Sequence, residues 1–329
     1  ANDMVVASGM MVADELEVPP GGTAVLLLPR RMGPLRTSSV QKNAYRVRSS
    51  DPVAVYQFSP YCCNFSVSND ASLLFPTSAL GTTYRYVGAP FTNQNPAGLV
   101  APPVISIVAP FDGTNVSVTL PRGARIALEA EQGIEQNGNT YTAQLNAQDV
   151  LLLTGTLEGA TEDDLTGADI SANQAIAVFS THVCTSYPET TAACDHLQEQ
   201  LLPVSTWGGG YLLVPPRLRG MMSPLNQERT YWKLIGTDRD TQIRFNAPFA
   251  NLNPHRPGFA DVPYCGDLLS GGDTVILRAG NHCEFGTTTP TQIVADGPIM
   301  VLGFMSGQDS ALGSLLPSGD PSVFLVPPE

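Results

Sequence analysis

Charged side chains are scarce in this chain of 329 residues. Asp, Glu, Lys and Arg make up 14% of it, against roughly 25% in ordinary soluble domains. Positive charge is scarcest: there are two lysines, Lys42 and Lys233, and the formal net charge is −13. This balance excludes nucleic acid and anionic membrane surfaces as partners, because both are bound through clusters of Lys and Arg.

Long apolar runs are also missing. The longest, such as residues 24–29 and 150–154, are far shorter than the ~18–20 residues of a membrane-spanning helix, so we expect no membrane insertion. The chain begins Ala-Asn-Asp rather than with Met, which predicts export with a cleaved signal peptide.

Helix-forming stretches are rare because 28 Pro and 30 Gly are spread along the chain, where they interrupt helices and mark turns between strands. Hydrophobic residues still make up 43% of the sequence, enough to fold around a core. We therefore expect an all-β protein.

The cysteines show no C-x-x-C spacing, which argues against zinc and redox motifs. Six are present: Cys62, Cys63, Cys184, Cys194, Cys265 and Cys283. An even number is typical of disulfides in an oxidising, extracellular compartment, and proximity in sequence favours Cys184–Cys194 and Cys265–Cys283. Three states stay open for Cys62 and Cys63: a vicinal disulfide, free thiols, or bonds between chains.

One strand-like pattern occurs three times, at residues 52–58, 175–181 and 298–304, with spacings of 123 and 123. A second recurs upstream at spacings of 125 and 125, in residues 22–28, 148–153 and 272–277. A third lies downstream: Leu-rich segments ending in Pro at 74–76, 201–203 and 315–317, followed by strand-like residues 84–87, 211–214 and 323–326.

A repeat of about 124 residues is too long for a solenoid unit and has the size of a β-module. We expect three tandem β-sandwich-like modules: residues 1–100 (truncated at its start), 101–222 and 223–329. Expected strands of the second are 104–109, 115–120, 140–145, 150–153, 175–181 and 211–214, with an Asp-Gly hairpin turn at 111–114. The third has counterparts of the first two strands at 231–236 and 241–246.

Several segments match a known family in their order of motifs. They are residues 52–58, 68–82, 107–114, 164–170, 182–184, 194–196, 199–203 and 207–208. Over roughly residues 50–305 the chain resembles the N-terminal domain family of the IgG Fc-binding protein, and within it a secreted bacterial member. The resemblance implies an extracellular protein with a role in adhesion or binding and no enzymatic activity.

We therefore expect an extracellular or cell-surface protein that binds a protein or glycan ligand. The alternative is a structural subunit that binds copies of itself head to tail and forms a filament. This alternative follows from the first repeat, which lacks the opening pair of strands and would leave a sheet edge open to a neighbouring strand. Coverage of that edge by residues 3–12 of the same chain is the competing expectation.

Candidate metal ligands cluster at His182, Cys184, Cys194, Asp195 and His196. We favour a Cys184–Cys194 disulfide with packed histidines, and so expect no metal site. Calcium is the cofactor left open, at the acidic stretches 162–164 and 238–240, although we favour solvated acidic loops at both. Three aspartates before the Leu-rich segments, Asp70, Asp195 and Asp309, are expected to cap short helical turns.

No catalytic site is expected. Residues 307–312 faintly resemble a serine-hydrolase motif but lack the strand–turn–helix context, and residues 208–210 do not form a phosphate loop because no Lys follows. Asn64 and Asn115 occupy N-glycosylation sequons. We expect Trp207 and Trp232 in the core.

Overall fold

The protein is described by a computed structural model that covers residues 16–26, 28, 37–59, 70–90, 101–129, 132–156, 164–189, 191, 194–217, 228–259, 262–307 and 320–329. It divides into two units, Ala1–Pro34 and Leu35–Glu329. In the first unit, the described residues form one turn, in which the Gly22 N–H donates to the Pro19 carbonyl at 2.8 Å. The strand expected at 22–28 is wrong for residues 22–26 and 28, which form no ladder and leave Val25 and Leu28 exposed.

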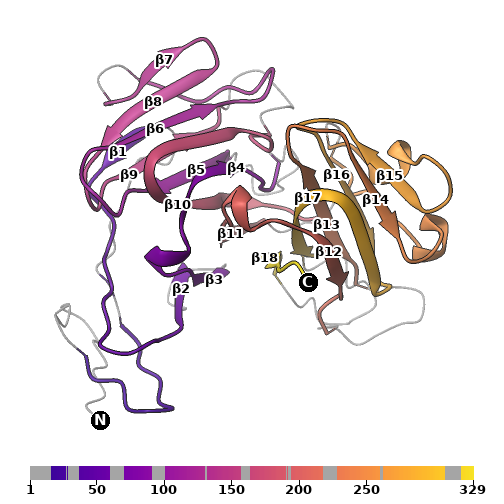
Figure 1. The fold of residues 1–329 in the computed structure, drawn as a ribbon, viewed down its shortest axis with the longest axis horizontal. Helices are drawn as coiled ribbons and strands as arrows, with labels where there is room; N and C mark the ends of the chain where they lie inside the picture. The colour runs from indigo at the N-terminus through magenta and orange to yellow at the C-terminus, as the bar shows by residue number, and fades with distance from the viewer. Residues whose placement is uncertain are drawn as a thin grey trace. The chain divides into compact units, whose positions relative to one another are not determined.

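The second unit is all-β, as the sequence predicts (Figure 1). Its strands are β1 (Ser39–Gln41), β2 (Val55–Ser59), β3 (Asp70–Leu74), β4 (Gly81–Arg85), β5 (Pro103–Val108), β6 (Thr114–Thr119), β7 (Glu135–Asn137), β8 (Thr140–Leu145), β9 (Val150–Thr154), β10 (Asp169–Thr185), β11 (Asp195–Gln200), β12 (Gly208–Leu213), β13 (Thr230–Gly236), β14 (Thr241–Phe245), β15 (Thr274–Leu277), β16 (His282–Thr287), β17 (Thr291–Met305) and β18 (Ser322–Val326). Four 3₁₀ turns accompany them: η1 (Thr77–Ala79), η2 (Val204–Thr206), η3 (Phe249–Leu252) and η4 (Cys265–Leu268).

Two long strands organise the two main sheets. β10 pairs with β4 and β6 along its first half, and with β5 and β11 along its second half. β17 is used in the same way, with β12 and β14 on its first half and β13 and β18 on its second. Each long strand therefore belongs to two half-sheets, and in Figure 1 β10 curves from one to the other.

The turn at residues 111–114 corrects the hairpin expectation. Gly113 adopts a φ of +69°, which an Asp-Gly turn needs. β5 and β6, however, do not pair with each other, because each pairs with a different half of β10. The turn is a corner between half-sheets, and residues 237–240 connect β13 to β14 in the same way.

Three antiparallel hairpins share one register. Val55 faces Leu74 between β2 and β3, and Val301 faces Val326 between β17 and β18. In β10 and β11 the equivalent contact is the hydrogen bond from Leu201 N–H to the Val178 carbonyl, 2.8 Å. β18 thus has the role of β3 and β11, so the expectation that residues 323–326 correspond to the strands at 84–87 and 211–214 is wrong.

Two strands cross the expected module boundaries. β4 precedes residue 100 but pairs with β10, and β12 precedes residue 222 but pairs with β17. They are held alike: in β4, the Gly81 N–H donates to the Tyr84 hydroxyl, which donates to the Ile176 carbonyl at 2.7 Å. Tyr211 makes the same two bonds in β12, to Gly208 and Ile299.

The apolar core follows strand alternation. β14 has the burial pattern of a strand with one face inward. All seven residues of β13 are buried because its two faces pack into different apolar clusters, Tyr231 and Ile235 into one and Trp232 and Leu234 into the other. Trp207 and Trp232 are both buried. Two of the three aspartates expected to cap helical turns, Asp70 and Asp195, instead begin strands β3 and β11. The turns η1 and η2 start after Pro76 and Pro203 without a side-chain cap.

Candidate binding surface and buried charge network

The outward face of strands β10, β6, β8 and β7 carries polar side chains along its whole length. Alternation along these strands points apolar residues inward and places Asn, Ser, Thr and Gln outside. One row crosses five strands in register: Thr83, Ser171, Ser117, Thr142 and Glu135. A sheet face with this composition can donate and accept many hydrogen bonds without carrying a strong field.

A shallow groove of about 810 Å³ lies over this face. Its polar lining comes from Asn115, Ser117, Thr142, Gln144, Ser171 and Asn173. Residues 132–135, which lead into β7, also line the groove. One end is held by the Asn173 side chain, which accepts from the Asn115 N–H at 2.8 Å and donates to the Gly113 carbonyl at 3.1 Å.

The groove chemistry suits a neutral polar ligand. Its hydroxyls and amides match sugar hydroxyls or the backbone of an extended peptide, and Glu135 is the one acidic or basic residue among its described lining residues. Polar groups placed at fixed positions set ligand orientation. The sequon residue Asn115 lies in this groove with an exposed side chain.

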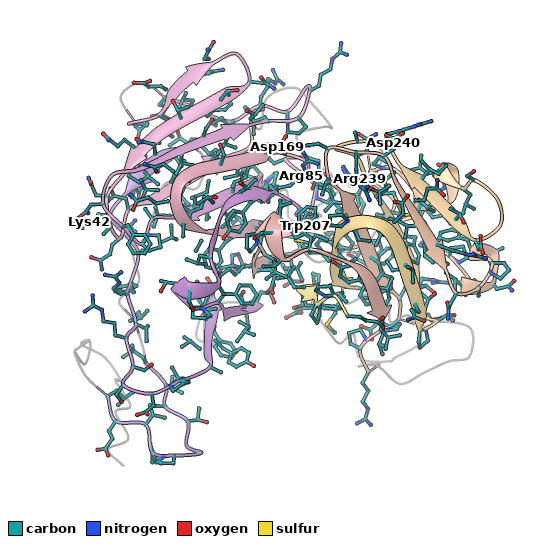
Figure 2. The ribbon with its side chains drawn as sticks, viewed as in Figure 1. Lys42, Arg85, Asp169, Trp207, Arg239 and Asp240 are labelled. Carbon is teal, nitrogen blue, oxygen red and sulfur yellow. A yellow bond between two sulfur atoms is a disulfide. The ribbon has the colours of Figure 1, made fainter. Side chains whose placement is uncertain are left out.

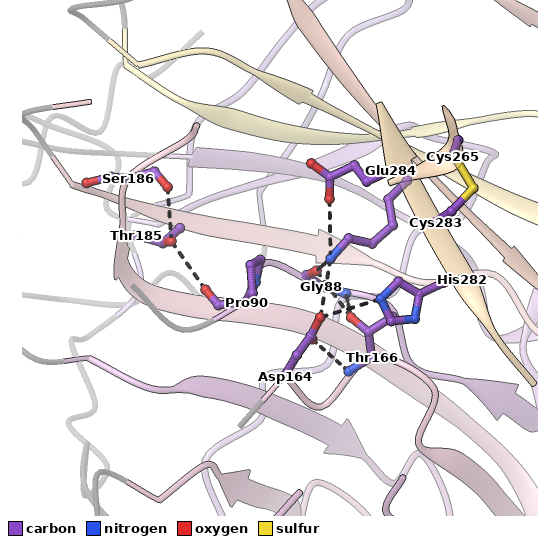
Figure 3. A network of polar contacts seen from close by, with 11 residues as sticks. Gly88, Pro90, Asp164, Thr166, Thr185, Ser186, Cys265, His282, Cys283 and Glu284 are labelled. Carbon is purple, nitrogen blue, oxygen red and sulfur yellow. Dashed lines mark hydrogen bonds and ion pairs between the residues drawn. A yellow bond between two sulfur atoms is a disulfide. The ribbon is translucent and has the colours of Figure 1, made fainter. Parts of the chain in front are cut away.

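A second cluster is buried between β13, β16 and the segments before β10 and after β4 (Figure 3). Lys233 has no exposed side-chain surface, and its Nζ donates to the Gly88 carbonyl at 2.7 Å. The same Nζ lies 3.5 Å from Asp164 Oδ2 and 3.6 Å from Glu284 Oε2. Lys233 and Glu284 are cross-strand neighbours in the β13–β16 ladder.

The pKa values of the two carboxyl groups in this cluster are shifted in opposite directions. Burial raises the pKa of Glu284, only partly opposed by Lys233. Burial also acts to raise the pKa of Asp164, but the positive neighbours outweigh it and leave that pKa below its ordinary value. Burial and Lys233 lower the pKa of His282 to about 4, so at neutral pH Lys233 is the charge that Asp164 faces.

A second buried cation is Arg85, at the end of β4 (Figure 2). Its guanidinium bonds Asp169 at 2.8 Å, the Gly236 carbonyl at 3.0 Å, and Asp238. These contacts join β4 and β10 to the corner that follows β13. Asp240 pairs with Arg278, so a calcium ion at residues 238–240 would compete with two ion pairs.

The hairpin strands β3, β11 and β18 meet at buried polar groups. Asp70 accepts hydrogen bonds from Gln198 N–H at 3.0 Å and the Ser322 hydroxyl at 2.7 Å. The Gln200 N–H donates to the Ser72 hydroxyl at 2.9 Å. Side chains of the β2–β3 hairpin thereby accept hydrogen bonds from backbone N–H groups at the edge of β11.

Glu199 lies in the same junction and is 6% exposed. Burial raises the pKa of Glu199 to about 8, and the nearby Asp70 adds to the increase, against hydrogen bonds with Ser72 and the Leu325 backbone. Burial likewise raises the pKa of Asp70. The junction therefore holds a carboxyl group that is largely protonated at neutral pH.

Among the residues predicted from sequence, Cys184 and Cys194 form a disulfide with Cα atoms 5.0 Å apart. Cys265 and Cys283 form another at 4.9 Å; both separations are normal for disulfides. Across the described ranges no three His, Cys, Asp or Glu side chains are grouped to hold a metal ion. Burial and His196 lower the pKa of His182 to about 3.

Some predicted residues lie outside the described residues. They are Cys62, Cys63, Asn64, Glu162, Asp163 and Asp309.

Sequence reasoning missed the Lys233 cluster, Glu199 and the polar groove. One signal was available for Lys233, which is one of two lysines and lies in the apolar run 231–235. The partners of Lys233 come from segments 69 and 51 residues away along the chain, Asp164 and Glu284, and no local pattern connects them.

No helix in the described part of the chain is long and apolar enough to cross a membrane. No solved structure matches this chain. The human IgGFc-binding protein is 32% identical over 148 residues, which are 44% of this chain and 2% of that protein. The family described as IgGFc binding protein matches residues 70–329, which is most of the chain, and the protein therefore belongs to the IgGFc-binding protein family.

Proposed function

We propose that this protein is an extracellular binding protein without catalytic activity, and that its ligand occupies the groove over β6, β8 and β10. Family membership supports a binding role, and the two disulfides support an oxidising location. The observation that carries the choice of site is the hydroxyl- and amide-lined groove. Export by a cleaved signal peptide and a secreted bacterial source remain predictions.

The ligand is a protein or a glycan, and the groove chemistry accepts either. Binding of the whole chain to immobilised IgG Fc, to a mucin glycoprotein and to the same mucin without its glycans separates these classes. Replacing Ser171→Arg or Thr142→Arg, both central in the polar row, should weaken binding by about tenfold or more, because each fills the groove with a long cation.

Gln242→Arg is the matched control, since Gln242 is exposed on β14 and does not line the groove. It should bind like the wild type. Equal binding by all four proteins would show that the ligand uses another surface, and binding of none of the three probes by the wild type would remove the Fc and mucin proposals.

We infer further that the chain contains three related β-modules, each built around one hairpin. The common register of the hairpins supports this, as do the equivalent bonds of Tyr84 and Tyr211. In this arrangement β4 and β12 each follow one module in sequence but pair with the long strand of the next module. The repeating unit of about 124 residues then consists of one hairpin and one strand that pairs with the following module.

The second candidate function is self-assembly, favoured by one observation. Tyr56 and Phe58 on β2 are 60% and 50% exposed, whereas the residues at the same register on β17, Leu302 and Phe304, are fully buried. Within the described residues β2 pairs with β3 alone. An exposed apolar strand face of this kind can pack against another copy of the chain.

Electron microscopy and sedimentation of the purified chain test self-assembly. Filaments or oligomers that dissolve in a Tyr56→Ser, Phe58→Ser double variant would support it. A chain that stays monomeric at high concentration would contradict it and leave the binding proposal untouched.

A further inference from the structure

The buried cluster around Lys233 places an amine in contact with two carboxyl groups, the arrangement from which an amide bond between side chains can form. We propose that Lys233 and Asp164 form an intramolecular amide crosslink, with Glu284 as the acid that assists its formation. The crosslink would join strand β13 covalently to the segment that precedes β10.

Proximity is the first support. Lys233 Nζ lies 3.5 Å from Asp164 Oδ2, so the amine is in contact with the carboxyl group whose carbon it would attack. The side chain of Lys233 is fully buried and that of Asp164 is 13% exposed. Since both are anchored next to or within strands, the pair is held together without the cost of ordering flexible side chains.

The position of the third group is the second support. Glu284 is fully buried and its Oε2 lies 3.6 Å from the same Nζ. It faces Lys233 across the β13–β16 ladder, so one amine lies between two carboxyl groups. Burial raises the pKa of Glu284, which favours the carboxylic acid form that the proposal assigns to it.

The surroundings are the third support. The ring of Phe304 lies 5.7 Å from Lys233 Nζ and stacks on Tyr187 at 4.3 Å. Tyr231 packs against Tyr187 from another side. These rings pack against the buried polar cluster, and burial of this kind excludes water and protects an amide once it has formed.

The chemistry balances without any further reactant. One proton passes within the pair from Nζ to the Asp164 carboxylate, against the lowered pKa of that carboxyl group, and gives a neutral amine and a carboxylic acid. Nζ then attacks Cγ of Asp164 while Glu284 protonates the oxygen that leaves. A C–N bond forms, a C–O bond breaks, one water is released, and Glu284 recovers its proton from the nitrogen.

The test is the intact mass of the purified, reduced and denatured whole chain. The crosslink predicts a mass one water molecule below that of the sequence, and a branched peptide that contains both Lys233 and Asp164 after proteolysis. A wild-type chain with the full mass, and with the Lys233 and Asp164 peptides separate, would overturn the proposal whatever the variants do.

Three variants assign the roles. Asp164→Asn changes the leaving group from water to ammonia, so a crosslinked chain would lose the mass of ammonia instead. Glu284→Gln keeps the shape of the side chain, and should slow formation by about 100-fold or more, as loss of a general acid does. Lys42→Arg is the matched control at the other lysine and should crosslink like the wild type; loss of the water deficit in this control would contradict the assignment to Lys233.

Discussion

At the residue scale, the buried ionisable groups are the unusual feature of this protein. Few charges are present, yet Lys233, Arg85, Glu284 and Glu199 are among those taken out of water. Buried charges are tolerated when they are paired and hydrogen-bonded, and a buried acid without a full partner stays protonated. These residues therefore determine how stability responds to pH and to substitution.

Glu199 makes stability fall as pH rises. Its ordinary pKa is 4.5 and its pKa in the fold is about 8, so the stabilisation from its protonated form is complete below about pH 4.5 and is lost as pH rises to about 8. Glu199→Gln should remove this loss, and relative to wild type should gain about 4 kcal/mol between pH 5 and pH 9. Urea unfolding at both pH values measures it, and parallel curves for the two proteins would contradict it.

Arg85 should matter more than the exposed arginine of a surface pair. Arg85→Ala removes a buried side chain with three partners and should lower the free energy of unfolding by about 2–4 kcal/mol. Arg278→Ala breaks an exposed pair with Asp240 and should leave the free energy of unfolding nearly unchanged. Denaturant midpoints compare them; equal losses would show that Arg85 contributes no more than a surface charge.

At the element scale, β4 and β12 should be stabilised by the same side-chain contact. Tyr84→Phe and Tyr211→Phe each remove a hydroxyl that bonds a carbonyl of the long strand. Each should cost about 1–2 kcal/mol, because the carbonyl loses a buried donor. Tyr56→Phe is the control, as Tyr56 is 60% exposed, and it should be neutral. Different losses at Tyr84 and Tyr211 would argue against equivalent roles for the two strands.

The strands themselves were largely predictable. The sequence expectations at 140–145 and 231–236 agree with β8 and β13 to within one residue, because alternation and turn residues define strand ends locally. Pairing was not predictable. The Asp-Gly turn predicts that the chain reverses, but not that β5 and β6 bond to different halves of β10.

Apolar composition alone also led to a wrong prediction of a strand. Residues 22–28 have the composition of a buried strand, yet the described part of this segment forms no ladder. A strand needs a partner edge, and that partner is set by tertiary contacts that a single sequence does not show. The same limit explains why the groove could not be foreseen: its residues come from β6, β8 and β10, up to 58 positions apart.

At the scale of the whole molecule, the two disulfides should stabilise separate regions. Peptide mapping without reduction should recover Cys184 joined to Cys194 and Cys265 joined to Cys283. Each bond should contribute about 2–4 kcal/mol by restricting the unfolded chain. Free or cross-paired thiols at these four positions would contradict the pairing.

The central claim is that the polar face of β6, β8 and the first half of β10 binds the ligand. Hydrogen–deuterium exchange of the whole chain, with and without whichever probe binds, tests it most directly. The account predicts that protection on binding is confined to residues 114–119, 132–145 and 169–173, with β14 and β15 unchanged. Protection confined to β14 and β15, or to the β2–β3 hairpin, would contradict it.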